Sequence, residues 1–501
     1  MTEPPRRLDD IARRLGERRA GAIVVEDASV ALTGAELETA VEGAAETLRT
    51  RGIRPGDRVV VINENSVSLA VLVLALSRIG AWPVLVNARL SAAEIDGIAG
   101  HCSARAFACT TAASPAASDH ARRLGAGEVI LENVGAVGLS AVRRSAPEPV
   151  TGGADDVAAL IYTSGTTGTP KGVMLSHDNL LFVARTSGAL RRVSPDDRVY
   201  GVLPISHVFG LASVFLGSLY HGARLRHVPR FEPGALADAL AAGSISVLQG
   251  VPAMYARMLA LAGERGGCPA PGLRYISSGG APLDLALKQR VEALWGLPLH
   301  NGYGLTETAP TVSMTDIDRP ADDDSVGPVV PGDELSIRAI EDGRDLPVGE
   351  VGEIWIRGPN VMKGYYRDPD ATAAAMTPER FFRSGDLGRM DGTGNLYVVG
   401  RLKDLIIRSG FNVYPPEVEG VLCQHPDVML AAIVGRPSPD GANEDIVGFV
   451  QPVRGRELDA DTLRAFVAER LAPYKRPTHY VFMDELPATA AGKVLKARLP
   501  A

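Results

Sequence analysis

Short apolar runs rich in β-branched residues alternate with longer segments of helical period along most of the chain. From about Asp57 these segments are separated by Gly, Pro or Asp, a pattern typical of βα units. We therefore expect parallel sheets covered by helices. The predicted strands include Val59–Ile62, Ala158–Tyr162, Val199–Leu203, Val247–Gln249 and Tyr275–Ser277, and the predicted helices include Leu180–Leu190 and Leu283–Trp295.

The pattern changes at roughly Pro328, where short strands follow one another closely with turn signals and no helix between them. Glu353–Arg357 and Leu396–Val399 are examples, and they predict a small β-rich lobe. A second change, at Lys403, opens an α+β pattern. It contains a helix from Pro416, strands at Leu430–Val434, Ile446–Val450 and Tyr480–Met483, and a helix over Asp461–Leu471.

The predicted fold class is α/β in two domains. Residues 1–402 are expected to form a large N-terminal domain of βα-built sheets with the β-rich lobe, and residues 403–501 a small α+β C-terminal domain. The length of 501 residues agrees with this division, since about 150 residues per domain suggests about three domains or lobes.

Charge and hydropathy exclude several classes of partner. Lys and Arg number 52 against 59 Asp and Glu, so the net charge of −7 favours neither nucleic acid nor an anionic membrane. The longest apolar run, Leu69–Leu76, is far shorter than the roughly 18 residues of a spanning helix. The arginine pairs near the N-terminus are followed by no apolar stretch, which excludes a secretory signal. The four cysteines show no metal or disulfide spacing, so we expect a reducing, cytoplasmic setting.

One segment, from Tyr162 to Gly172, carries the strongest chemical signal. It reads YTSGTTGTPKG, a strand followed by a loop of small hydroxyl residues, glycines and one lysine. Glycines let backbone N–H groups approach an anion, hydroxyls add donors and lysine adds a point charge, so such a loop can wrap phosphates. The spacing is not that of a Walker loop, and the alternative reading is a flexible Ser/Thr/Gly turn.

Four further segments gain meaning beside this loop. Residues 301–308 (NGYGLTET) place a ring, a hydroxyl and a carboxylate at the end of a predicted strand, where α/β proteins bind ligands. Residues 277–282 (SSGGAP) could let a flat ring approach closely. Residues 382–388 (FRSGDLG) place Asp386 in a predicted turn of the lobe, and residues 486–493 (LPATAAGK) end in a single lysine. Taken alone, each segment is equally well read as a turn or a solvated side chain.

Together and in this order, the segments resemble those of the adenylate-forming superfamily of acyl-CoA synthetases, peptide-synthetase adenylation domains and beetle luciferases. The resemblance extends from about Leu32 to Lys493. It implies an ATP-dependent carboxylic acid:CoA ligase, an acid-thiol ligase that needs ATP, Mg²⁺ and coenzyme A and acts through an acyl-adenylate. It is also compatible with a homodimer.

The resemblance assigns the nucleotide site residue by residue. Tyr303 would pack on adenine, Thr306 would touch the α-phosphate and Glu307 would hold Mg²⁺, while Asp386 would accept the ribose hydroxyls with Arg401 beside it. Lys493 would be the catalytic lysine of adenylation and Lys403 the hinge between the domains. The phosphate loop contributes Thr163, Ser164, Gly165, Thr166, Thr167, Gly168 and Lys171, and the adenine pocket Gly280, Ala281, Pro282, Asn301, Gly302 and Gly304.

His207 is the informative histidine among nine, because none occurs in HxxxH or HExxH spacing. One reading is a hydrogen-bonded core histidine, and the other, implied by the resemblance, is a residue beside the acyl pocket and the path of the thiol. The same pocket would be lined by Val208, Phe209, Val251, Gly279, Gly280 and Leu305, and the coenzyme A contacts would be Arg89, Gly410, Tyr474 and Arg476.

The segments expected to line the acyl pocket contain neither Lys nor Arg: Ile205–Ala212, Ser246–Tyr255, Ser277–Pro282 and Asn301–Thr311. A second carboxylate would be buried there without a cation, at a cost of several kcal/mol. We therefore predict an uncharged apolar acid, either a medium-chain acid of fatty acid metabolism or an aromatic one. Two alternatives stay open: a ligase that loads a carrier protein, and a non-catalytic nucleotide-binding member.

Overall fold

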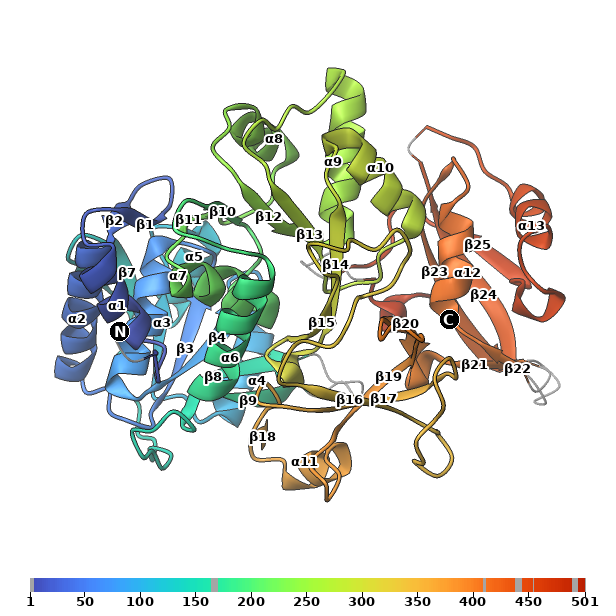
Figure 1. Ribbon diagram of the computed structural model, residues 1–501. Coiled ribbons are helices and arrows are strands. Elements are labelled where there is room, and N and C mark those ends of the chain that lie inside the picture. Colours follow the sequence, from blue (N-terminus) through green and yellow to red (C-terminus); the bar gives the residue numbers. More distant parts are fainter. Residues whose placement is uncertain are drawn as a thin grey trace.

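The fold is described from a computed structural model, over residues 4–163, 170–408, 411–437, 444–453, 455–488 and 494–500. Ser164, Gly165, Thr166, Thr167, Gly168, Gly410 and Lys493 of the predicted site lie outside these residues. Figure 1 shows a large body formed by the N-terminal and central parts of the chain, with the C-terminal part packed on one side of it.

Two mixed sheets, each of eight strands among the described residues, build the large body. The first has the order β15-β14-β13-β12-β10-β11-β1-β2, with parallel pairing from β14 to β1 and an antiparallel strand at each edge. Its strands are β1 (Ile23–Glu26), β2 (Ala31–Thr33), β10 (Arg198–Gly201), β11 (Arg224–His227), β12 (Val247–Gly250), β13 (Tyr275–Ser278), β14 (Leu299–Gly304) and β15 (Thr311–Met314).

The second sheet has the order β18-β9-β8-β4-β3-β5-β7-β6. Strands β8, β4, β3 and β5 are parallel, and the outer strands pair antiparallel, so the expectation of wholly parallel sheets was wrong at the edges. The strands are β3 (Arg58–Asn63), β4 (Trp82–Asn87), β5 (Ala106–Cys109), β6 (Gly127–Leu131), β7 (Gly135–Leu139), β8 (Val157–Thr163), β9 (Lys171–Ser176) and β18 (Gly364–Tyr365).

Helices cover these sheets as the pattern predicts. Helix α3 (Val67–Ile79) is apolar on all sides, and every residue in it except Arg78 is buried, as expected of a helix in the core of a large domain. The other helices of the body are α1 (Asp10–Arg18), α2 (Gly34–Thr50), α4 (Ala92–His101), α5 (Pro115–Arg123), α6 (His177–Leu190), α7 (Gly217–Tyr220), α8 (Pro233–Ala241), α9 (Pro252–Arg265) and α10 (Leu285–Trp295).

The β-rich lobe is a four-stranded antiparallel sheet of order β16-β17-β19-β20. The prediction that no helix interrupts this part of the chain was wrong. Helix α11 (Pro369–Ala375) follows β18, which joins the second large sheet beside β9, and Asp368 caps the helix at Ala371. The lobe strands are β16 (Glu334–Arg338), β17 (Gly352–Arg357), β19 (Phe382–Met390) and β20 (Leu396–Arg401).

The C-terminal part has a core of its own, in which Val418, Leu422, Ile433 and Leu463 are fully buried. A three-stranded sheet, β23-β24-β25, and a hairpin, β21-β22, carry helices α12 and α13. The hairpin was not predicted. The elements are β21 (Ile406–Arg408), β22 (Phe411–Val413), α12 (Pro415–Cys423), β23 (Val428–Pro437), β24 (Glu444–Pro452), α13 (Ala460–Ala468) and β25 (His479–Phe482).

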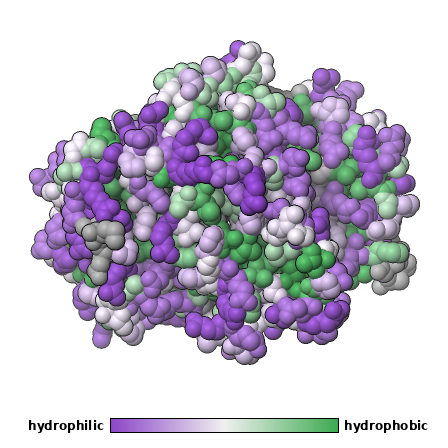
Figure 2. Space-filling view, in the orientation of Figure 1, coloured by the Kyte–Doolittle hydropathy of each residue, from purple (hydrophilic) through white to green (hydrophobic). Residues whose placement is uncertain are grey.

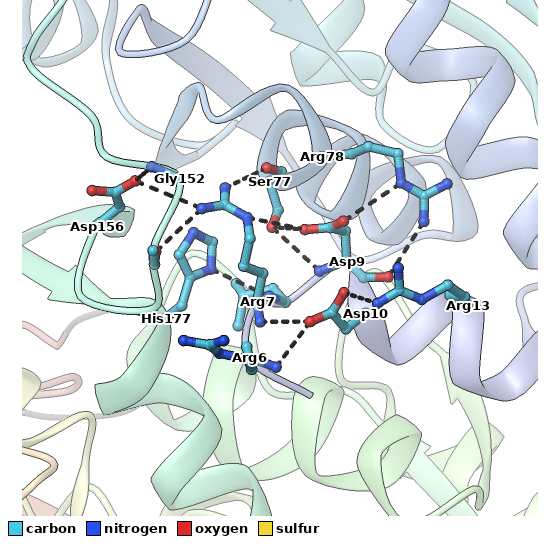
Figure 3. A network of polar contacts seen from close by, with 12 residues as sticks. Arg6, Arg7, Asp9, Asp10, Arg13, Ser77, Arg78, Gly152, Asp156 and His177 are labelled. Carbon is cyan, nitrogen blue, oxygen red and sulfur yellow. Dashed lines mark hydrogen bonds and ion pairs between the residues drawn. The ribbon is translucent and has the colours of Figure 1, made fainter. Parts of the chain in front are cut away.

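The N-terminal arginines belong to the fold of the large body (Figure 3). Arg7 donates to the carbonyl of Ser77 at 2.7 Å and lies 3.7 Å from Asp156, while Arg78 pairs with Asp9 at 3.5 Å. The backbone N–H of Leu8 donates to Nδ1 of buried His177. This network ties the start of the described chain to α3 and to α6.

Polar residues cover most of the face shown in Figure 2, and hydrophobic residues gather in smaller patches on it. Among the described residues, no helix is both long enough and apolar enough to cross a membrane.

Candidate active site

The run NGYGLTET lies at the carboxyl end of β14, beside the edge strand β15. Gly304 must be a glycine here, because a Cβ on it would lie 1.8 Å from the carbonyl oxygen of Pro310. Thr306 and Glu307 follow in a short 3₁₀ turn, Thr306–Thr308. Asn301 is buried, and its side-chain oxygen accepts from the N–H of Gly302 at 3.0 Å.

Tyr303, Asp386 and Arg401 form a connected polar group between the first large sheet and the lobe. The Tyr303 hydroxyl donates to Asp386 Oδ2 at 2.8 Å, and Arg401 Nε lies 3.0 Å from Asp386 Oδ1. Asp386 is only 4% exposed. Burial and the neighbouring Asp386 carboxylate hold the pKa of Tyr303 well above its ordinary value, so the phenol stays protonated and donates.

The placement of Asp386 corrects the sequence prediction. It was expected in a turn, but it lies within strand β19 and pairs across the sheet with Arg401 of β20. Its backbone N–H donates to Ser384 Oγ at 3.0 Å, and the preceding Gly385 has a φ of +67°. A run of Ser, Gly and Asp reads as a turn, yet here these residues form an irregular stretch inside a strand.

Glu307 and Lys171 meet at a residue that sequence reasoning missed. The Tyr365 hydroxyl donates to Glu307 Oε1 at 2.8 Å, and Lys171 Nζ lies 4.7 Å from the centre of the Tyr365 ring. Burial and the Glu307 carboxylate raise the pKa of Tyr365, which keeps it a donor. Only the pairing of β18 with β9 brings Tyr365 here, so no local sequence signal could have identified it.

The ends of the predicted phosphate loop face each other. Thr163, the last residue of β8, pairs with Lys171, the first residue of β9. The residues between them that carry the prediction, Ser164 to Gly168, lie outside the described part of the chain. The structure therefore places the base of the loop next to Tyr365 and Glu307.

Part of the predicted acyl pocket is brought together where β13 and β14 end. A Cβ on Gly279 would lie 3.1 Å from the Phe209 ring and 3.7 Å from the carbonyl of Gly302. A Cβ on Gly280 would lie 3.8 Å from Val251, and Gly280 has a φ of +76° that favours glycine. Val208 is almost wholly buried, and Leu305, Ala281 and Gly302 are half-buried. The contacts thus bring Gly279 against the Phe209 ring and Gly280 beside Val251.

Phe209 opens a π-helix, Phe209–Leu216, a form often found at functional sites. Gly210 permits it, because a Cβ there would lie 2.1 Å from the carbonyl of Pro204. His207 precedes this helix and is exposed, so the reading as a core histidine was wrong. Its Nδ1 accepts from the backbone N–H of Phe209 at 3.4 Å.

The residues expected to contact coenzyme A are spread over both domains. Arg89 follows β4 and lies 3.5 Å from Glu64. Tyr474 stacks on exposed Phe411 of β22, with ring centres 4.6 Å apart. Arg476 donates to the carbonyls of Leu471 and Ala468, both at 2.8 Å. The structure thus brings Tyr474 and Arg476 near the β21-β22 hairpin, while Arg89 lies on the large body.

The remaining predicted residues lie at exposed positions around these groups. Lys403 is exposed in a 3₁₀ turn, Leu402–Asp404, directly after β20, and Pro282 is exposed before α10. Helix α10 begins at Leu285 with Asp284 as its cap, two residues later than predicted. Within the described residues no three His, Cys, Asp or Glu side chains gather as a metal site.

The chain is similar to known proteins along most of its length. The model of the AMP-binding enzyme family matches residues 11–366, and that of the AMP-binding enzyme C-terminal domain matches residues 417–493. A feruloyl-CoA synthase of Amycolatopsis sp is 37% identical over 481 residues, covering 95% of each chain. A 2-succinylbenzoate–CoA ligase of Geobacillus kaustophilus is 36% identical, covering 100% of this chain and 98% of its own.

Solved structures show the same architecture. ATP-bound MatB from Rhodopseudomonas palustris superposes with a TM-score of 0.84 at 32% identity, and apo MatB with 0.76, each covering 98% of this chain and 97% of its own. MenE from Bacillus subtilis with ATP and magnesium has a TM-score of 0.83 at 28% identity, covering 98% of both chains. The predicted α/β fold class and the predicted superfamily are thereby confirmed, and the chain belongs to the AMP-binding enzyme family.

Proposed function

We propose that this chain is an AMP-forming acid–thiol ligase that joins an uncharged, apolar carboxylic acid to coenzyme A. Its curated relatives are CoA ligases of nearly the same length, and ATP, Mg²⁺ and coenzyme A follow from that reaction. The observation that carries the proposal is the pair of polar groups built on β14: Tyr303 with Asp386 and Arg401, and Glu307 with Tyr365 and Lys171.

The first polar group, Tyr303 with Asp386 and Arg401, fits a nucleoside. Asp386 would accept the two ribose hydroxyls, and Arg401 would keep its carboxylate ionised and in place. The hydroxyl of Tyr303 donates to Asp386, and the Tyr303 ring would pack on one face of adenine. Gly280 and Ala281 would lie on the other face of the adenine ring. Thr306, Thr163 and the loop that follows Thr163 would donate to the phosphates.

The second group fits a magnesium nucleotide. Mg²⁺ takes oxygen ligands and is often held by one or two carboxylates together with substrate phosphates, so the single carboxylate of Glu307 suits it. Glu307, held at Oε1 by the Tyr365 hydroxyl, would supply that carboxylate. When bound, the ion neutralises charge on the phosphates. Lys171 adds a positive charge at the same place, and Lys493 would bridge the carboxylate and the α-phosphate.

The chemistry then proceeds in two halves. The acid carboxylate attacks the α-phosphorus and pyrophosphate leaves, after which the thiol of coenzyme A attacks the acyl carbon and AMP leaves. Two anions meet in the first half, so preorganised positive charge lowers that barrier most. The second half would use Gly410, Tyr474, Arg476 and Arg89, after the C-terminal domain, residues 403–501, turns about Lys403.

The acyl pocket favours an aromatic acid. Phe209 lies against Gly279, and Val251 lies beside Gly280, so these side chains would offer a flat acid an apolar, uncharged surface. Apolar contact is worth about 25 cal/mol per Å² buried, whereas a second charge would find no cation on the lining segments. A relative named for feruloyl points to an aromatic monoacid as well, whereas 2-succinylbenzoate, the acid of another relative, shares the aromatic ring but carries a second carboxylate.

The first prediction concerns this choice of acid. We would measure kcat/KM for benzoate, a hydroxycinnamate, octanoate, malonate and acetate. The values for the aromatic acids should be higher than those for acetate and malonate by about tenfold or more. The readout is AMP release that depends on both acid and thiol. A preference for malonate or acetate would mean that the pocket is misplaced.

The same assay separates the alternatives. A carrier-protein ligase would release pyrophosphate with the acid but form no thioester with free coenzyme A, and a non-catalytic member would do neither. We propose that the reaction takes place in the cytoplasm, because the described cysteines are unpaired thiols, as is usual in a reducing compartment. Homodimer formation stays a prediction, to be measured by sedimentation.

A further inference from the structure

Helix α12 of the C-terminal domain lies against two elements of the large body. At its start, Gly400 of β20 faces it, since a Cβ on Gly400 would lie 3.6 Å from Pro416 and 3.8 Å from Tyr414. Further along, a Cβ on Gly420 would lie 3.7 Å from Asp284 Oδ2 and within 4 Å of nothing else. Asp284 caps α10 by accepting from the N–H of Leu287 at 3.0 Å.

The Asp284 carboxylate also acts on the next turn of α12. Burial is the main cause that raises the pKa of Cys423 to about 12, and the charges of Asp284 and Glu419 add to it. The Cys423 thiol therefore lies in the field of the Asp284 carboxylate. Asp324 adds a further negative charge near Asp284. Glu419 itself is neutralised by Lys496 at 2.7 Å. Position 420 of α12 therefore faces a carboxylate.

Asp284 stands two residues after Pro282, the last residue of the segment that we assign to the adenine and acyl sites. The contact with α12 thus connects the C-terminal domain directly to the site. In Figure 1, the β21-β22 hairpin, which flanks Gly410, lies far from β14 in this arrangement. The arrangement superposes better on ATP-bound MatB, with a TM-score of 0.84, than on apo MatB, with 0.76.

We propose that α12 docks on the N-terminal cap of α10 while the adenylate forms, and that this contact is made at position 420, which faces the Asp284 carboxylate. Glycine inside a helix costs about 0.5–1 kcal/mol relative to alanine. A methyl group would fit at 3.7 Å, but a longer side chain would reach the carboxylate. The inference rests on the proposed function, because it concerns the balance between the two half-reactions.

The test adds charge of either sign at this position. Gly420→Lys should attract Asp284, hold the docked arrangement and raise pyrophosphate exchange relative to thioester formation from a supplied acyl-adenylate, by about threefold or more. Gly420→Glu should shift the same ratio about threefold the other way. Gly420→Ala is the matched control and should leave the ratio unchanged, although it strengthens the helix.

A double variant shows whether Asp284 is the partner. Asparagine caps a helix as well as aspartate, so Asp284→Asn keeps α10 intact and removes the charge. In that background the effect of Gly420→Lys should fall below twofold. If Lys and Glu shift the ratio in the same direction, or if the Lys effect survives Asp284→Asn, the docking proposal is wrong.

A second readout does not need catalysis. Trypsin should cut at the exposed hinge around Lys403 more slowly in Gly420→Lys and faster in Gly420→Glu when ATP and Mg²⁺ are present, as judged by fragment mass. If the unaltered chain catalyses neither half-reaction with any acid, the proposed function fails, while the order of cleavage rates still decides the docking contact. Equal cleavage rates in the two charge variants would overturn it.

Discussion

At the scale of single residues, the site depends on hydroxyl groups that hold carboxylates in place. Tyr303 and Tyr365 each donate to one carboxylate, Asp386 and Glu307 respectively, at the same distance of 2.8 Å. Both phenols are buried, and burial together with the neighbouring carboxylate keeps them protonated. Each carboxylate is therefore oriented before a nucleotide arrives, which is the condition for preorganised electrostatic catalysis.

The prediction at this scale is that Tyr365→Phe weakens the use of Mg²⁺. The ring that faces Lys171 is kept, but the donor to Glu307 is lost, and a hydrogen bond to a charged group is worth about 1.5–3 kcal/mol. Pyrophosphate exchange should fall about tenfold, with a raised requirement for Mg²⁺ measured by titration. Tyr366→Phe is the matched control, because its hydroxyl donates to Glu148 instead. An equal loss in both variants would assign Tyr365 to the fold alone.

At the scale of elements, a buried carboxyl joins the lobe to the large body. Asp333 precedes β16, and its Oδ2 accepts from Asn360 Nδ2 at 2.6 Å, while Asn360 also donates to the carbonyl of Thr311 in β15 at 2.9 Å. Asp333 Oδ1 and Asn360 Oδ1 are buried, without a hydrogen-bond partner among the described residues. Burial raises the pKa of Asp333 to about 7, only partly opposed by the Asn360 contact.

This carboxyl should make stability depend on pH. Because the folded pKa lies above the unfolded one, the unfolded chain ionises first, and the free energy of unfolding falls as pH rises from about 4 to about 7. Asp333→Asn should remove most of this slope and raise Tm at pH 8 by a few degrees, with little change at pH 4. Thermal unfolding at both pH values measures it, with exposed Asp322→Asn as the control. A lower Tm at pH 8 would contradict the assignment.

At the scale of the whole molecule, we propose that two half-reactions share one site by exchanging faces of the C-terminal domain. Lys493→Ala should lower acid-dependent pyrophosphate exchange by about 10²-fold or more, while a supplied acyl-adenylate still becomes thioester.

Gly410→Leu should lower thioester formation and leave pyrophosphate exchange largely intact, because a side chain there would obstruct the thiol. Both half-reactions are followed separately in each folded variant. An equal fall of both in either variant would remove that residue from its assigned half.

Several features of the fold and site follow from sequence alone. The alternation of apolar runs and helical segments predicts the strands β3, β8, β12 and β13 and the helices α6 and α10 nearly at their bounds. Local chemistry identifies the run around Tyr303 and Glu307, because strand ends of α/β sheets gather ligand-binding residues. Hydrophobic period and loop composition are properties of neighbouring residues, so they can be read directly from the chain.

Other features were decided only by tertiary structure. Asp386 is a strand residue opposite Arg401, since sheet pairing overrode the turn preference of Ser, Gly and Asp. Tyr365 reaches Glu307 through β18, which pairs with β9 from nearly 200 positions away in the chain. Gly420 and Asp284 meet only because one domain docks on another. Sequence therefore determined the order of the elements and which residues are candidates for the chemistry, and long-range packing decided which of them meet, because contacts between distant segments leave no local pattern.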